Sequence, residues 1–187
     1  MDAVLYRFYT KYSFVSISDL IALFHHRWAA PVLAELERQK GSRFAALAAM
    51  LGLGRESLRR TLDALIALGL VARNPGYGHP LRPEYALTAR GEPVARRCRR
   101  LLEAVGDERE VLLRKWSLPV LVALRGAGRF SELRDGLPGI TPRALALALK
   151  DLQRAGLVER VVDESAYPPT VAYAATPAAK PLQRMLT

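Results

Sequence analysis

Apolar side chains recur at helical spacing in a stretch that the chain carries twice. Residues 54–73 read GRESLRRTLDALIALGLVAR, and residues 141–160 read TPRALALALKDLQRAGLVER. In the first stretch Leu58, Leu62 and Leu65 stand at positions i, i+4 and i+7, which puts them on one face of a helix. The pattern therefore predicts the same amphipathic helix at two places in the sequence.

The residues around this helix predict the same further elements in both copies. Gly69 and Gly156 stand where the helix would end in a left-handed residue, and Thr141 is a good N-cap with Pro142 in the first turn. Two shorter helical patterns come before the repeated helix, and two apolar strands separated by a Pro-rich or Gly-rich loop follow it. The helical patterns cover residues 28–37, 43–51, 116–124 and 129–137, and the strands cover residues 70–73, 84–88, 157–162 and 171–176.

The two copies keep one phase over most of the chain. Matching residues are separated by 86 to 88 positions, and the offset changes only where loops are expected. The matched pairs include Trp28 with Trp116, Pro31 with Pro119, Phe44 with Phe130, Leu62 with Leu149, Gly69 with Gly156, Tyr85 with Tyr173, and Thr88 with Thr176. Agreement at this many positions indicates two copies of one folded unit.

The order helix, helix, helix, strand, strand predicts a winged helix-turn-helix in each copy. The expected fold class is mainly α with small β-hairpins (α+β), as two tandem units joined by a long helical linker and related by a pseudo-two-fold axis. We expect residues 1–104 to hold an N-terminal helix, the first unit and the linker helix, and residues 105–187 to hold the second unit.

The second copy resembles the HxlR-type winged-helix transcription regulators over residues 114–182. It carries Arg-Phe followed by Glu-Leu, then LPGITP, GLVER and a Pro-Pro wing before YAAT, and the first copy matches more loosely over residues 27–91. Members of that family usually carry one unit and work as homodimers on DNA, so the resemblance implies a fused pseudo-dimer. The N-proximal sensor cysteine of some relatives is absent, so thiol sensing is not implied.

Charge and cysteine content narrow the function further. The chain has 28 Lys and Arg against 18 Asp and Glu, a net charge of +10 that suits a polyanion. Residues 1–104 hold 16 basic and 9 acidic residues, and residues 105–187 hold 12 and 9. The only cysteine is Cys98, which excludes an intrachain disulfide and fits the reducing cytoplasm. With no apolar stretch of membrane-spanning length, we expect a cytoplasmic protein without a membrane partner, metal or cofactor.

The third helix of each unit holds the candidate DNA contacts, because in a helix-turn-helix it enters the major groove of double-stranded DNA. Arginines read guanine edges and hold phosphates. The predicted DNA-binding residues of the first unit are Arg55, Ser57, Arg59 and Arg60, with His79 and Arg82 from its wing, and those of the second are Thr141, Arg143, Lys150 and Arg154. A solvated helix face is the alternative interpretation of these positions.

The second unit is expected to bind DNA less well than the first. Ala146 and Leu147 replace Arg59 and Arg60, and an exposed leucine could contact either a thymine methyl or another protein. Its wing carries Asp163 and Glu164, which phosphates repel, so the two units should not read identical half-sites.

Two function classes other than DNA binding are a protein-interaction scaffold and an enzyme. Tandem winged helices also occur as protein-interaction scaffolds of the chromosome-segregation type, and one unit on DNA with the other on protein fits the sequence as well. An enzyme is disfavoured because adjacent His25 and His26 point to different faces of a helix and no nucleophile or phosphate-loop motif is present. Homodimerisation through the terminal helices and the identity of any small-molecule effector stay open.

Overall fold

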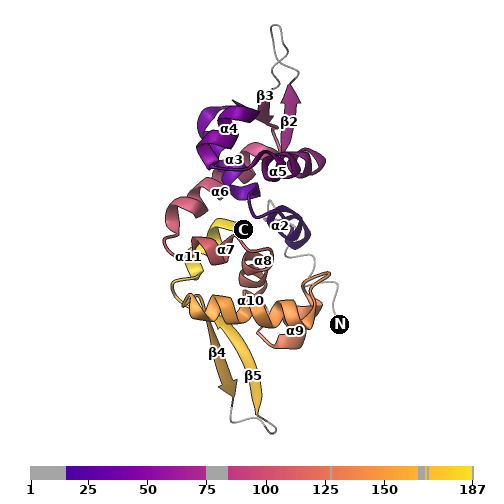
Figure 1. The fold of residues 1–187 in the computed structure, drawn as a ribbon. Coiled ribbons are helices and arrows are strands. Elements are labelled where there is room, and N and C mark those ends of the chain that lie inside the picture. The colour runs from indigo at the N-terminus through magenta and orange to yellow at the C-terminus, as the bar shows by residue number, and fades with distance from the viewer. Residues whose placement is uncertain (1–15, 75–83, 127, 164–166, 168, 187) are drawn as a thin grey trace, which may run out of the picture. The chain divides into compact units, whose positions relative to one another are not determined.

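The computed structural model describes residues 16–74, 84–126, 128–163, 167 and 169–186 (Figure 1). The chain divides into two units. The first winged unit comprises residues 26–106, and the second winged unit comprises residues 107–187 together with residues 1–25. The described residues are mainly helical with small antiparallel sheets, as the sequence pattern predicts.

The first winged unit has the predicted order of three helices, a two-stranded wing and a closing helix. Its strands form one antiparallel sheet in the order β1-β3-β2, with Val71 opposite Leu87 and Ser42 opposite Tyr85. The elements are α3 (Ala29–Gln39), β1 (Ser42–Arg43), α4 (Phe44–Leu51), α5 (Arg55–Ala67), β2 (Val71–Asn74), β3 (Glu84–Leu87) and α6 (Gly91–Ala104).

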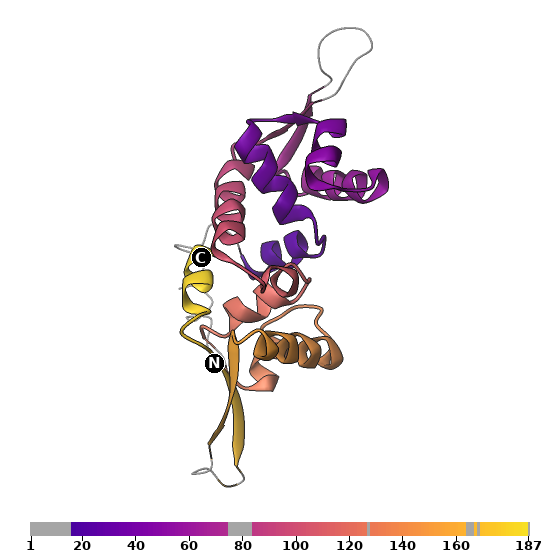
Figure 2. The same ribbon diagram turned by 60° about the vertical axis from the view of Figure 1, so that its left-hand side comes forward.

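The second winged unit repeats this order with one strand reduced. A single bridge between Arg129 and Ala172 stands where the first unit has β1, and the β4–β5 hairpin pairs Val158 with Ala175 (Figure 2). The elements are α7 (Arg109–Leu112), α8 (Ser117–Ala123), α9 (Phe130–Asp135), α10 (Pro142–Arg154), β4 (Val158–Asp163), β5 (Thr170–Ala175) and α11 (Lys180–Leu186).

The helix α2 (Ile17–Phe24) belongs to the second winged unit although it precedes the first in sequence. Leu20, Leu23 and Phe24 are buried, and α2 packs against α8. From the sequence we expect this helix to belong with residues 1–104. Its apolar face indicates that it must be covered but does not say by which part of the chain.

The stretch expected to be a long linker helix is instead divided. Helix α6 ends at Ala104, Val105 is extended, and Gly106 follows before α7 begins. Helix α6 packs along α3 and buries Val94, Cys98 and Leu101, so most of the stretch is part of the core of the first winged unit. Its apolar stripe is covered by α3.

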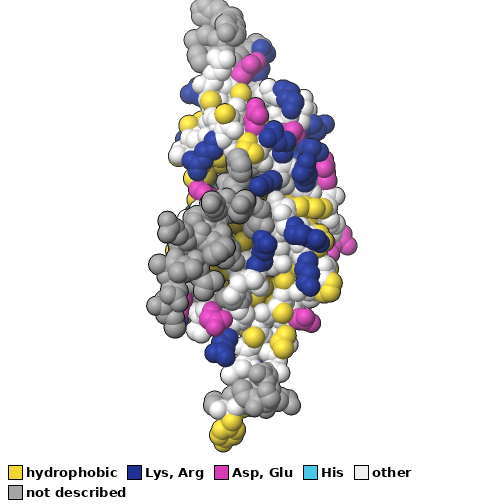
Figure 3. Space-filling model, turned by 180° about the vertical axis from the view of Figure 1, so that it is seen from behind, with side chains coloured by type: hydrophobic (Ala, Val, Ile, Leu, Met, Phe, Trp, Pro, Cys, Tyr) yellow, Lys and Arg dark blue, Asp and Glu magenta, His cyan; other side chains and the backbone are white. Residues whose placement is uncertain are grey.

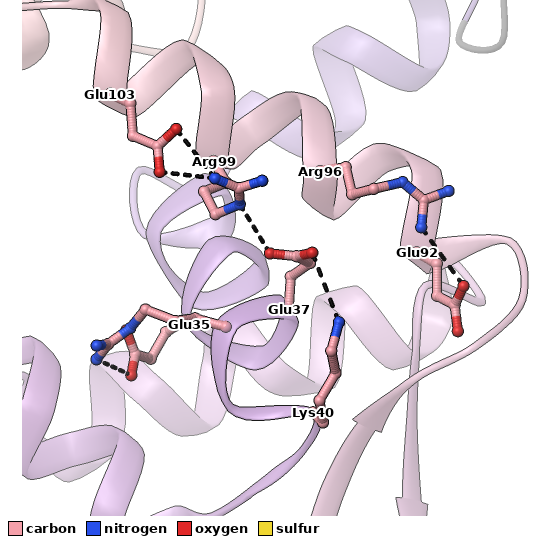
Figure 4. Close-up of polar contacts among 8 residues, drawn as sticks. Glu35, Glu37, Lys40, Glu92, Arg96, Arg99 and Glu103 are labelled. Carbon is pink, nitrogen blue, oxygen red and sulfur yellow. Dashed lines mark hydrogen bonds and ion pairs between the residues drawn. The ribbon is translucent and has the colours of Figure 1, made fainter.

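A salt bridge crosses the contact between α6 and α3. Arg99 Nε lies 2.8 Å from Glu37 Oε2, and Arg99 Nη1 lies 2.8 Å from Glu103 Oε1 (Figure 4). These two carboxylates raise the pKa of the Arg99 guanidinium, the hydrogen bond with Glu103 contributing most. The Arg99–Glu37 salt bridge, together with the buried apolar contacts, holds α6 in register with α3.

The third helix of each unit ends at a left-handed glycine, as predicted. Gly69 and Gly156 both have φ +68°. The hydroxyl of Thr88 donates to the carbonyl oxygen of Gly69 at 2.7 Å, and that of Thr176 donates to Gly156 at the same distance. One hydrogen bond of the same kind therefore ties the end of the third helix to the end of the wing in both units.

Gly91 begins α6 directly against this junction. A Cβ at this position would collide with the carbonyl oxygen of Leu70, whose backbone is held by a hydrogen bond from the Thr88 N–H. Gly91 also donates its own N–H to the Thr88 hydroxyl at 3.0 Å. Only glycine fits here without moving the backbone.

Gly91→Ala should therefore lower the free energy of unfolding by about 1–3 kcal/mol, the usual cost of forcing an atom into a packed site. Urea denaturation of the full chain measures this. Gly54→Ala is the control for added volume, because its Cβ would meet no atom within 4 Å. Gly54 is the N-cap of α5, where alanine is less favourable than glycine, so this variant should cost about 0.5–1 kcal/mol. Equal unfolding midpoints for the two variants would contradict the close approach at Gly91.

Candidate nucleic-acid interface

Helix α5 separates an apolar face from a basic face. Leu58, Leu62 and Leu65 are buried in the first winged unit. The opposite face of α5 exposes Arg55, Arg59 and Arg60, which belong to the predicted DNA-binding set and lie in the first half of the helix. Ser57, the other member of that set on α5, is half-buried. The helical period that buries the leucines is the reason that these arginines point away from the core.

Acidic neighbours hold two of these arginines on the helix surface. Arg59 Nη2 lies 2.9 Å from Glu56 Oε1, and Arg60 Nε lies 3.3 Å from the same oxygen. Arg59 also lies 3.8 Å from Asp63. Within the described ranges Arg55 forms no ion pair, so its charge is the least compensated of the three. Exposed pairs of this kind exchange readily for a stronger anion.

Helix α10 carries its cations farther apart. The side chain of Thr141 accepts the N–H of Ala144 at 3.2 Å and caps the helix as predicted, with Pro142 at the first position. Arg143, Lys150 and Arg154 are exposed and form no ion pairs among the residues that the structure describes. The capping hydroxyl of Thr141 is thus occupied by its own helix.

An apolar side chain stands in the middle of the exposed face of α10. Leu147 is 53% exposed, and Ala146 beside it is exposed too. Arg59 and Arg60 of α5 occupy the matching positions in the first unit. The exposed surface of α5 is therefore charged where the exposed surface of α10 is apolar, as the sequence predicts.

The structure describes more residues of the second wing than of the first. His79 and Arg82, the predicted wing contacts of the first unit, lie outside the described residues, as does Glu164. In the second unit Val161 and Val162 of β4 are 45% and 41% exposed, and Tyr167 is fully exposed. The second wing therefore presents apolar and aromatic side chains to solvent.

Two further cations, which the sequence analysis did not select, lie on the wing strands. Arg73 on β2 is opposite Tyr85, and Arg160 on β4 is opposite Tyr173. Both arginines are exposed. The repeat itself carries the signal that could have found them, because Arg73 and Arg160 match at the offset of the third helix.

Positive side chains predominate among the charged groups on the face drawn in Figure 3, with carboxylates beside several of them. In the described part of the chain no group of histidine, cysteine and acidic side chains is arranged to hold a metal ion. Among the same residues no helix combines the length and apolarity that crossing a membrane requires.

Two units with this element order and an exposed third helix define a protein of the winged helix-turn-helix class. The family HxlR-like helix-turn-helix matches residues 23–109 and 111–187. The chain therefore belongs to the HxlR-like helix-turn-helix family, with one family domain in each half.

Proteins similar to this chain are named HTH-type transcriptional regulators. The chain is 40% identical over 64 residues to the uncharacterized HTH-type transcriptional regulator YtfH of Escherichia coli, covering 34% of this chain and 50% of that protein. It is 36% identical over 78 residues to regulator sll1512 of Synechocystis, covering 41% and 57%. It is 35% identical over 91 residues to regulator YvaP of Bacillus subtilis, covering 48% and 79%. The chain thus spans between half and four fifths of these relatives.

The single cysteine lies in the core of the first winged unit. Cys98 is 2% exposed on α6, and burial raises the pKa of its thiol to about 12. The thiolate is the reactive form of cysteine, so this side chain is held in its unreactive state. Cys98 is a small apolar core residue, as its position on the apolar stripe predicts.

Iodoacetamide at pH 8 should accordingly leave Cys98 unmodified in the native chain and alkylate it in urea, because only unfolding lowers its pKa to the ordinary range and exposes the sulfur. Mass spectrometry of the intact chain measures the modification. Alkylation in native buffer as fast as in urea would show that the thiol is accessible and contradict its place in the core.

Proposed function

We propose that the chain is a DNA-binding transcription regulator that uses its two fused, non-identical winged units on one duplex. The observation that carries this proposal is the pair of exposed, cation-bearing third helices, α5 and α10, in a chain of the HxlR-like family. The contacts proposed are the ten residues predicted from the sequence, joined by Arg73 and Arg160 of the wing strands.

The position of the cations supports major-groove binding by α5. Helix-turn-helix proteins contact base edges with the N-terminal part of the recognition helix. Arg55, Arg59 and Arg60 all lie in the first half of α5, and the leucines that anchor the helix are on the other face. A phosphate carries a full charge and can replace Glu56 as the partner of Arg59 or Arg60.

The difference between the helices supports an unequal division of affinity. On α10 the exposed cations stand at Arg143 near the start and at Lys150 and Arg154 in the second half, with Leu147 between them. Fewer cations near the helix start mean fewer groove contacts. We therefore assign the stronger DNA binding to the first winged unit.

The presence of both family domains in one chain supports an intrachain pseudo-dimer. In dimeric helix-turn-helix proteins two recognition helices read two half-sites, and the symmetry of the operator follows that of the protein. Here the two helices differ in sequence, so the proposed operator has two unlike half-sites and one chain occupies both.

A second function is favoured by the apolar surface of the second unit. Leu147, Val161 and Val162 are between 41% and 53% exposed, and Tyr167 is fully exposed. Aromatic and apolar side chains of this kind are enriched in protein interfaces. The alternative is therefore a chain whose first unit binds DNA and whose second unit binds a protein.

Fluorescence anisotropy of a labelled random-sequence duplex, titrated with the full chain at several salt concentrations, tests the proposal. Binding whose log K falls steeply with log salt would mean that several phosphates are neutralised. Absence of binding at low salt would refute DNA binding and favour the protein-interaction function, which a search for a protein partner would then examine.

Arg55→Ala should weaken binding of the random duplex by about three- to tenfold and reduce the salt slope by about 1, if this arginine holds a phosphate. Arg38→Ala is the control, because it removes the same charge from α3, where Arg38 pairs with Glu35 at 2.7 Å. Equal losses for both variants would mean that only net charge matters and that α5 is not the contact surface.

Glu56→Gln should change DNA affinity and stability in opposite directions. The substitution frees Arg59 and Arg60 and removes a charge that phosphates repel, so random-duplex binding should tighten by about three- to tenfold. Loss of an acidic side chain from the first turn of α5 should lower the free energy of unfolding by about 0.3–1 kcal/mol. Anisotropy and urea denaturation measure the two effects, and unchanged or weaker random-duplex binding would contradict the placement of Glu56 beside the phosphates.

A further inference from the structure

A cavity of about 720 Å³ opens in the second winged unit between the end of α8, the start of α9, strand β5 and helix α11. Its volume is in the range of sites that hold small molecules, and it is open to solvent over much of its extent. Backbone and apolar side chains of Leu124, Tyr173, Ala174 and Ala175 line part of it, and three cations, Arg125, Lys180 and Arg184, line another part. The cavity is away from the exposed face of α10, none of whose residues lines it.

The matching positions of the first winged unit follow from the repeat. Thr88 and Thr176, which make the same hydrogen bond in the two units, are 88 positions apart. At the same offset Pro93 matches Pro181 in the next helix. Lys180 and Arg184 of α11 therefore correspond to Glu92 and Arg96 of α6. On the preceding core helix Arg125 corresponds to Glu37, since Leu124 corresponds to Leu36.

In the first unit these positions form internal ion pairs. Arg96 Nη1 lies 3.6 Å from Glu92 Oε2, one helical turn away on α6 (Figure 4). Glu37 accepts from Arg99 at 2.8 Å and lies 3.7 Å from Lys40 Nζ. With Glu103, which also pairs with Arg99, three carboxylates face the three cations Arg96, Arg99 and Lys40 in these ion pairs.

In the second unit both carboxylates are replaced by cations. Lys180 stands where the first unit has Glu92, and Arg125 stands where it has Glu37. Among the described residues Lys180 and Arg184 form no ion pair. The one carboxylate of the lining, Glu132, accepts the backbone N–H groups of Arg129 at 3.0 Å and Gly128 at 3.3 Å. The described lining of this cavity therefore holds three cations and one carboxylate.

We propose that this cavity binds a small organic anion, with a carboxylate or phosphate held by Lys180 and Arg184 and a compact apolar body against Leu124, Ala174 and Ala175. Like charges one helical turn apart destabilise a helix unless an anion lies between them. In the first unit Glu92 supplies the anion that pairs with the arginine one turn later on the same helix, and Lys180 takes its place in the second unit. A bound ligand supplies it here.

Isothermal titration calorimetry of the full chain without DNA tests the proposal, so its outcome is independent of the proposed function. The probes are phenyl phosphate and benzoate, which distinguish the two anionic groups, and benzyl alcohol, which keeps the apolar body without the charge. At least one anion should bind with one site per chain, and benzyl alcohol should bind at least about tenfold more weakly, since charge-assisted hydrogen bonds are lost.

Lys180→Glu is the decisive variant, because it places a carboxylate four residues before Arg184, as Glu92 stands before Arg96. The new side chain should pair with Arg184, keep the thermal midpoint at or above that of the wild type, and weaken the anion by at least about tenfold. Arg184→Gln, a second variant, should weaken it without adding a carboxylate.

Arg100→Glu makes the same change of charge on an exposed position of α6 in the first unit and should alter binding by less than about twofold. Failure of both anions to bind, equal binding of benzyl alcohol, or equal losses for Lys180→Glu and Arg100→Glu would overturn the proposal.

Discussion

The hydrogen bond from a threonine hydroxyl to a left-handed glycine is the constraint on which both units depend. It joins the glycine that follows the third helix to the threonine that directly follows the second wing strand, at 2.7 Å in each unit. In the first unit the same threonine also receives the N–H of Gly91, which starts α6. Three elements thus meet at one side chain. This junction sets where the third helix stops and where the wing returns. It is the same in both units, although their surface residues differ.

On this shared frame the two copies have diverged in charge. Helix α5 concentrates arginines and balances them with Glu56, whereas α10 spaces its cations around an exposed leucine. The helix that follows the wing shows the opposite division: α6 carries ion pairs, whereas Lys180 and Arg184 on α11 form none with the described residues. The buried leucines are alike in both units, so these surface differences leave the apolar packing of the third helix the same in each.

Much of this fold could be predicted from the sequence because its signals are local. The leucine period of α5, the glycines at 69 and 156 and the capping threonine at 141 each act within a few residues, and all three predictions are confirmed. The place of α2 could not be predicted, since an apolar face binds any complementary surface and chain order does not choose between two similar units. The division after Ala104 has a local signal in Gly106, which the apolar pattern around it outweighed when the stretch was predicted as one helix.

The candidate site was predicted in part. Exposure of Arg55, Arg59 and Arg60 follows from the helical period, but the pairing of Arg59 and Arg60 with Glu56 depends on rotamers that a sequence does not specify. Arg73 and Arg160 were missed because a single arginine on a strand is ordinary until its cross-strand neighbour is known. The cavity cations are distant in sequence and come together only when α8 and α11 pack.

The proposed function requires that one chain occupies one duplex with both winged units. The most direct measurement combines native mass spectrometry of the complex with a hydroxyl-radical footprint, on a duplex selected from a random library by the full chain. The account predicts one chain per duplex and two separate protected segments of unlike sequence. Two chains per duplex, or one protected segment under a single chain, would contradict it.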